Sequence, residues 1–230
     1  MPLQDNLLRG NIAATVARNA FRGGAANWPN SPPNAQSELD AHRVIAKTTI
    51  LAKHSWLSSI GISNPEIAAP SPNNLYDLGE YFGGNNSSFG NCGEMSAVAF
   101  RHLVELWRRT GYGTPLAHVG IFKGNHDFVV IGLPAHAMKV VSGFMWPHLI
   151  VSMDYAPDTI GADTVICDPW IDQGQGRVFR ALDRPRWHSF THDVLVQTNR
   201  QGAPVGNKLN LFVQVYCTSP DLSDQTVRIG

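Results

Sequence analysis

The segment FGNCGEMSAVAFRHLVELWRR, residues 89–109, indicates most clearly how this chain folds. Apolar residues recur in it at steps of three and four, so they form one face of a helix that we predict from Cys92 to Arg109. Glycines at positions 111 and 113 end that helix. The residues of the apolar face are Met95, Val98, Ala99, Leu103, Leu106 and Trp107.

Downstream of this helix the pattern changes to short runs rich in Val, Ile, Phe and Tyr, which is typical of strands. The runs are LAHVGIFKG (116–124), HDFVVIGL (126–133), HLIVSMDY (148–155), TVICDPW (164–170), RVFRAL (177–182) and KLNLFVQVYCTS (208–219). Because helices come first and strands after, without regular alternation, we predict an α+β fold. In it, the helix that begins at Cys92 packs on a mainly antiparallel sheet.

Upstream, the sequence predicts one further helix and two poorly structured regions. The helix begins after an N-cap at Ser37 and runs to about Ile60, ahead of a stop at Gly61. Residues 64–88 contain several prolines and glycines and are predicted to be a loop with short pieces of structure. Residues 1–36 are predicted to be a mobile leader, and residues 37–230 a single domain.

Composition excludes several classes of function. The chain of 230 residues has 18 basic and 18 acidic side chains and a pI near 7.1, so it lacks the positive charge of a nucleic-acid-binding domain. No apolar run approaches the roughly 18 residues that cross a bilayer, and residues 1–22 lack the apolar centre of a cleavable signal peptide. Three cysteines cannot form a disulfide framework, which favours reduced thiols.

Cys92 lies where a glycine-flanked loop meets the first turn of the predicted helix. The unpaired N–H groups and the positive end of the helix dipole stabilise a thiolate there and can hold a developing oxyanion. Gly93 leaves room for a substrate backbone to approach. The carboxamides of Asn91 and Asn86 are candidate second donors to the oxyanion, as is that of Asn85, and the sequence does not choose among them.

A nucleophilic cysteine needs an imidazole as proton acceptor and a third group that orients the imidazole. His126 opens the run HDFVVIGL and is our first choice for the base, with His118 as the second. Asp168 closes the run TVICDPW, where Pro169 prevents the strand from continuing, and we expect it to orient the histidine. Asp154 is its competitor.

The order of NCGE, HDFVV and VICDPW resembles the Cys-His-Asp order of the papain-like and transglutaminase-like thiol enzymes, within which it is most similar to bacterial effector and toxin domains that cleave or deamidate host proteins. The resemblance covers about residues 80–175. It implies a papain-like or transglutaminase-like fold, with Cys92 as nucleophile, His126 as general base and acid, and Asp168 as orienter. The 41 residues between His126 and Asp168 are more than usual in transglutaminase-like cores, so we expect an insertion around residues 135–157.

From these features we expect a cysteine-dependent amide hydrolase that acts on a protein or peptide, without a cofactor. Protease, deamidase and cell-wall amidase remain open, as does a catalytically silent interaction domain on the same fold. The resemblance also implies a protein made in a bacterial cytoplasm and injected into a target cell without a signal peptide. The sequence says nothing of oligomeric state.

Other chemistry-bearing residues are given structural roles. Cys167 and Cys217 lie in apolar runs and are expected to pack in the core. His188 and His192 are four residues apart, but nearby Arg184 and its neighbours favour an exposed turn, so no metal site is predicted. Trp170 follows the motif of Asp168 and is expected to wall the cleft.

Overall fold

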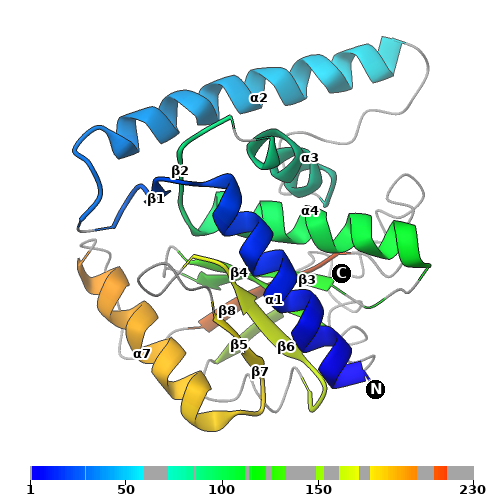
Figure 1. Ribbon diagram of the computed structural model, residues 1–230, viewed down its shortest axis with the longest axis vertical. Coiled ribbons are helices and arrows are strands. Elements are labelled where there is room, and N and C mark those ends of the chain that lie inside the picture. Colours follow the sequence, from blue (N-terminus) through cyan, green and yellow to red (C-terminus); the bar gives the residue numbers. More distant parts are fainter. Residues whose placement is uncertain are drawn as a thin grey trace.

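The chain forms helices and one large sheet that lie in layers (Figure 1). The computed structural model describes residues 2–28, 30–59, 72–84, 86–111, 114, 116–122, 126–132, 149–152, 161–170, 177–200 and 210–216. The helices in these ranges are α1 (Pro2–Ala20), α2 (Ala35–Ser59), α3 (Pro72–Gly83), α4 (Cys92–Thr110) and α7 (Arg184–Arg200). The strands are β1 (Gly24–Ala25), β2 (Phe89–Gly90), β3 (Leu116–Phe122), β4 (Asp127–Ile131), β5 (Leu149–Ser152), β6 (Val165–Asp168), β7 (Arg177–Arg180) and β8 (Asn210–Tyr216). The α+β class is thereby confirmed.

Within the described ranges the large sheet has six strands in the order β5-β8-β3-β4-β6-β7, and each neighbouring pair is antiparallel. This confirms the predicted antiparallel sheet. Strands β4 and β6 are adjacent, although β5 lies between them in the sequence and pairs at the opposite edge. The described part of the expected insertion, Leu149–Ser152, is therefore an edge strand of the sheet, and the rest of residues 135–157 lies outside the described residues.

Helices cover both faces of the sheet. Val129 and Ile131 of β4 belong to the core that contains α1 and α4. Phe128, which points the opposite way because side chains alternate along a strand, stacks edge-on against Phe190 of α7 at 5.2 Å between ring centroids. Every residue of β6 is buried, as expected for a strand enclosed on both faces.

Helix α4 begins at Cys92, as predicted, and extends one residue beyond the predicted end. Asn91 is its N-cap and forms a capping box with Glu94, whose carboxylate accepts the backbone N–H of Asn91 at 3.0 Å. At the other end Gly111 adopts a left-handed conformation with φ of 67° and donates its N–H to Trp107. These two caps fix where the helix starts, and hence where the thiol lies.

The prediction of a mobile leader over residues 1–36 is wrong for the described residues of that range. Residues 2–20 form α1, which packs beside α4 and over β6 and β7 (Figure 1). Its contact face is made of small residues: Ala13, Ala14 and Ala17 are almost completely buried. Alanines bury little area each, so the apolar signal in the sequence was weak although the helix docks closely.

Two other segments predicted to be irregular are helical. Pro72 starts α3 within the predicted loop 64–88, in the first turn, where a proline needs no backbone donor. Gly79 lets α3 approach α4, because a Cβ there would lie 2.2 Å from the carbonyl oxygen of Ala97. Arg184 starts α7 where an exposed turn was expected. Helix α2 begins at Ala35, two residues before the predicted N-cap.

Among the described residues, none of the helices combines the length and the apolar character that a membrane span requires.

Candidate active site

Three residues from three separate elements meet at one end of the sheet. Cys92 is the first residue of α4, His126 directly precedes β4, and Asp168 is the last residue of β6. Because β4 and β6 are antiparallel neighbours, with Val129 opposite Cys167, the start of one lies beside the end of the other. The structure therefore brings together the three residues that the sequence selected.

His126 and Asp168 form a buried charged contact. Nε2 of His126 lies 2.9 Å from Oδ2 of Asp168, and the side chains are 4% and 0% exposed. The other carboxylate oxygen, Oδ1, accepts the backbone N–H of Trp170 at 3.1 Å. Both oxygens of this buried carboxylate thus have partners, which fixes the plane of the imidazole ring.

The thiol of Cys92 hydrogen-bonds to the side chain of His126 and to the backbone of Asp127. Since Nε2 of His126 faces Asp168, Nδ1 is the ring nitrogen left for the sulfur. Cys92 itself is 6% exposed. The arrangement is a relay in which the histidine stands between a thiol and a carboxylate, the geometry that activates a cysteine nucleophile.

The environment shifts the pKa of both the thiol and the imidazole. Burial alone would lower the pKa of His126, but the charge of Asp168 and the hydrogen bond to it, helped by Cys92, raise that pKa to about 10. Burial raises the pKa of the Cys92 thiol, and the hydrogen bond with His126 opposes this rise. The imidazole is therefore a strong proton acceptor, and its charged form is held by Asp168.

Aromatic rings enclose His126. The ring of Trp170 lies 5.1 Å from it, and those of Phe190 and Phe128 lie at 5.9 and 6.3 Å. The indole N–H of Trp170 donates to the side chain of Asn27 at 3.3 Å. Trp170 therefore forms a wall beside the three residues, the place that the sequence suggested for it.

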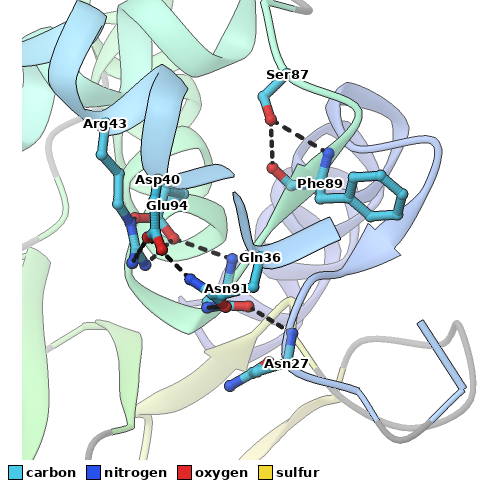
Figure 2. Close-up of polar contacts among 8 residues, drawn as sticks. All are labelled: Asn27, Gln36, Asp40, Arg43, Ser87, Phe89, Asn91 and Glu94. Atoms are coloured by element: carbon cyan, nitrogen blue, oxygen red, sulfur yellow. Dashed lines mark hydrogen bonds and ion pairs between the residues drawn. The ribbon is translucent and has the colours of Figure 1, made fainter. Parts of the chain in front are cut away.

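Asn91 does not act as a free oxyanion donor, because its polar groups hold the start of α4 in place (Figure 2). Its Oδ1 accepts the backbone N–H of Asn27 at 3.1 Å, and its amide nitrogen donates to Gln36 at 3.3 Å. Its capping partner Glu94 is paired with Arg43 through two contacts of 2.7 and 3.1 Å. Asn91 thus connects Asn27 and Gln36 to the start of α4, where Cys92 lies.

The other proposed oxyanion residues occupy different places. The amide of Asn86 donates to the backbone carbonyl of Tyr81 near the end of α3, so it caps that helix. Asn85 lies outside the described residues. Gly93 is in the first turn of α4, where a Cβ would lie 3.5 Å from Asp127 Oδ2, an ordinary contact. The backbone N–H groups of this first turn are the remaining donors.

His118, the alternative to His126, is not part of this contact. His118 lies on β3, with its Nε2 at 3.6 Å from Asp127 Oδ1, and Asp154 lies outside the described residues. His188 and His192 are exposed on α7. Within the described ranges no three metal-ligating side chains form a cluster.

The thiol of Cys167 is buried and donates to the backbone carbonyl of Gly10 at 3.4 Å. Burial raises the pKa of this thiol strongly. Cys167 therefore packs in the core, as expected. Cys217 lies outside the described residues.

A groove of about 780 Å³ lies beside the three residues, and the sequence alone does not predict it. It is formed by Arg18 and Asn19 of α1, by residues 21–25, 28 and 30–32 after that helix, and by Met95, Pro169 and Trp170. Because the sequence predicts a mobile leader over residues 1–36, it does not indicate these residues as part of a site. The one available signal was Trp28, a large aromatic residue among turn formers, which packs edge-on against Trp170 at 5.8 Å.

Comparison of the chain with family models, curated proteins and solved structures found no match.

Proposed function

We propose that this protein is a cysteine-dependent hydrolase of amide bonds. The observation that carries the proposal is the placement of His126 between the thiol of Cys92 and the buried carboxylate of Asp168. Nucleophile, base and orienting group in this order are the parts that acyl transfer requires. The resemblance of their three motifs to papain-like and transglutaminase-like enzymes supports the same assignment.

In the proposed reaction, the proton of the Cys92 thiol resides on His126 as an imidazolium that Asp168 stabilises, and the Cys92 thiolate attacks the amide carbonyl carbon. The oxyanion that forms accepts hydrogen bonds from the N–H groups of the first turn of α4. The imidazolium then gives its proton to the departing nitrogen, which leaves as an amine or as ammonia. A water molecule, deprotonated by His126, attacks the thioester and releases the acid with the thiol restored.

The departing nitrogen decides which kind of hydrolase this is. A peptide nitrogen makes the protein a protease or a cell-wall amidase, and a glutamine or asparagine side-chain nitrogen makes it a deamidase. Following the resemblance, we infer a bacterial effector that acts on a protein of a target cell.

A catalytically silent interaction domain is the second candidate, and the burial of Cys92 favours it. With 6% of the residue exposed and its pKa raised by burial, the thiol in this conformation offers little surface to a substrate. An active enzyme must open this site on substrate binding, whereas a silent domain need not.

Alkylation by iodoacetamide tests the proposal, with each cysteine followed by peptide mass spectrometry. Because His126 lowers the pKa of the Cys92 thiol against the effect of burial, His126→Gln should move the pH profile of Cys92 alkylation to higher pH. Cys167, which is 0% exposed, serves as the internal control and should stay unmodified in the native protein. An identical Cys92 profile in both proteins would contradict the activation.

Turnover is tested by incubating the protein with target-cell lysate and with peptidoglycan. A one-dalton gain identifies a deamidase and a new terminus identifies a protease or amidase. Cys92→Ala should abolish turnover and change the free energy of unfolding by only about 1 kcal/mol, because little packing volume is lost. Turnover that survives in Cys92→Ala would refute the assigned nucleophile.

A further inference from the structure

The groove beside the three residues carries unpaired positive charge. Arg18, in the last turn of α1, and Arg22, two residues after it ends, both line the groove. Neither guanidinium forms an ion pair or hydrogen bond with another residue of the described ranges, and no described acidic residue lines the groove. Two unpaired cations in a concave site attract an anionic ligand, and the described residues of the groove do not supply one.

The groove is also continuous with the catalytic residues. Met95 lies one turn after Cys92 on the same face of α4, and Pro169 directly follows Asp168. Trp170 lines the groove and lies against the ring of His126 at 5.1 Å. A peptide that reaches the thiol past Trp170 therefore has its neighbouring residues in the groove.

Its walls suit a short peptide rather than a small inorganic ion. The volume of about 780 Å³ lies within the range of ~300–1,000 Å³ that is typical of pockets for organic ligands. The edge-on pair of Trp28 and Trp170 supplies an apolar wall, whereas the arginines supply donors. This combination fits an extended peptide whose backbone packs on the tryptophans and whose acidic side chain binds the arginines.

We propose that this groove is the specificity site of the enzyme and that it binds an acidic side chain of the substrate, within a few residues of the amide that reacts. The proposal rests on the proposed function for its substrate, but the binding itself does not require catalysis. Arg18 and Arg22 donate to the carboxylate, and Trp28 and Trp170 contact the adjoining backbone. Neutral or basic peptides leave the two guanidinium groups without a partner and bind less tightly.

Binding is tested on the Cys92→Ala protein, which cannot turn substrate over, by fluorescence anisotropy. The probes are fluorescein-labelled octapeptides of one Gln in an Ala/Gly background, with either two Glu, two phosphoserine, two Gln or two Lys added. We expect the Glu peptide to bind at least about tenfold more tightly than the Gln peptide at low salt, with the difference reduced as salt rises. Equal binding of the Glu and Gln peptides would overturn the proposal, and a gain limited to phosphoserine would overturn the carboxylate.

Arg18→Gln/Arg22→Gln should abolish the preference for the Glu peptide. The single variant Arg22→Gln, at an exposed position, should reduce it if the double variant fails to fold. Arg109→Gln is the matched control, because Arg109 lies in the last turn of α4 as Arg18 does in that of α1, but at the far end of that helix from Cys92. A preference that persists in the double variant, or that Arg109→Gln abolishes equally, would refute the assignment to this groove.

Turnover separates this proposal from the proposed function. Wild-type turnover of a peptide library without enrichment of acidic residues near the reacting amide would overturn the specificity site alone. If the protein prefers acidic peptides but turns over none of the substrates tested, the groove is a peptide-binding site and the proposed hydrolase function is refuted.

Discussion

The contact between His126 and Asp168 should make the stability of the protein fall as pH rises above neutrality. The pKa of His126 is about 10 in the folded protein and about 6.5 in an unfolded chain. Between these values the folded state holds a proton that the unfolded state has lost, so raising the pH favours unfolding. The stabilisation is complete below about pH 6.5 and is lost as the pH passes through 10.

The magnitude can be worked out for an interval in which few other groups titrate. For one proton with these two pKa values, linkage gives a loss of about 1 kcal/mol in the free energy of unfolding between pH 7 and pH 8. Cysteine thiols ionise mostly above this interval in an unfolded chain. The pKa values of His102 and His118 are lowered by burial, so their effect on stability lies below pH 6.5.

Urea unfolding at 25 °C in the presence of reductant, at several pH values between 7 and 8, measures this slope. His126→Gln/Asp168→Asn removes both charged partners together, so no buried carboxylate is left unpaired, and its stability should change little over the interval. Cys92→Ala keeps the pair and should retain most of the slope. A flat profile in the wild-type protein, or an equal slope in the double variant, would refute the reasoning.

Two further predictions concern the supports of α4. In urea unfolding, Gly79→Ala should destabilise the protein by about 2–3 kcal/mol, because the new Cβ would overlap the backbone of α4. Gly83→Ala is the control and should change stability by less than about 1 kcal/mol, because its Cβ would have no neighbour closer than 3.8 Å. Arg43→Met should cost about 1–2 kcal/mol, since the buried carboxylate of Glu94 loses its partner while Arg43 itself is 41% exposed. Asp40→Asn, at an exposed position on the same arginine, is the control, and an equal cost in both would contradict the role of Glu94.

The parts of the fold that could be predicted are those with strong local signals. Helix α4 has a regular apolar face and a glycine stop, and its predicted bounds differ from the structure by one residue. The strands have continuous apolar runs because helices cover both of their faces. The sequence does not reveal α1, because alanines make most of its buried contact. It does not reveal α3 either, because Pro72 and Gly79 are typical helix breakers. In the structure, however, Pro72 lies in the first turn of α3 and Gly79 lies at the close contact with α4.

In the candidate site, too, some residues could be predicted from local patterns and others could not. Cys92, His126 and Asp168 each lie at or next to the end of an element with a strong apolar pattern, so the sequence could indicate them as polar residues that interrupt or border that pattern. The direction of the Asn91 carboxamide could not be predicted, since it depends on Asn27 and Gln36, which the sequence places far away. The groove was missed for a similar reason, because segments distant in the sequence form it jointly.

The position of α1 also affects folding during synthesis on the ribosome. Helix α1 docks against residues that follow much later in the chain: Asn6 donates to the carbonyl of Asp163, and Gly10 accepts from Cys167, each across 157 positions. Closing such long loops is slow, and it cannot occur before β6 has emerged. A nascent chain that ends before β6 would therefore contain α4 but lack the contact between α1 and β6, and Cys92, His126 and Asp168 can meet only after residue 168 has left the ribosome.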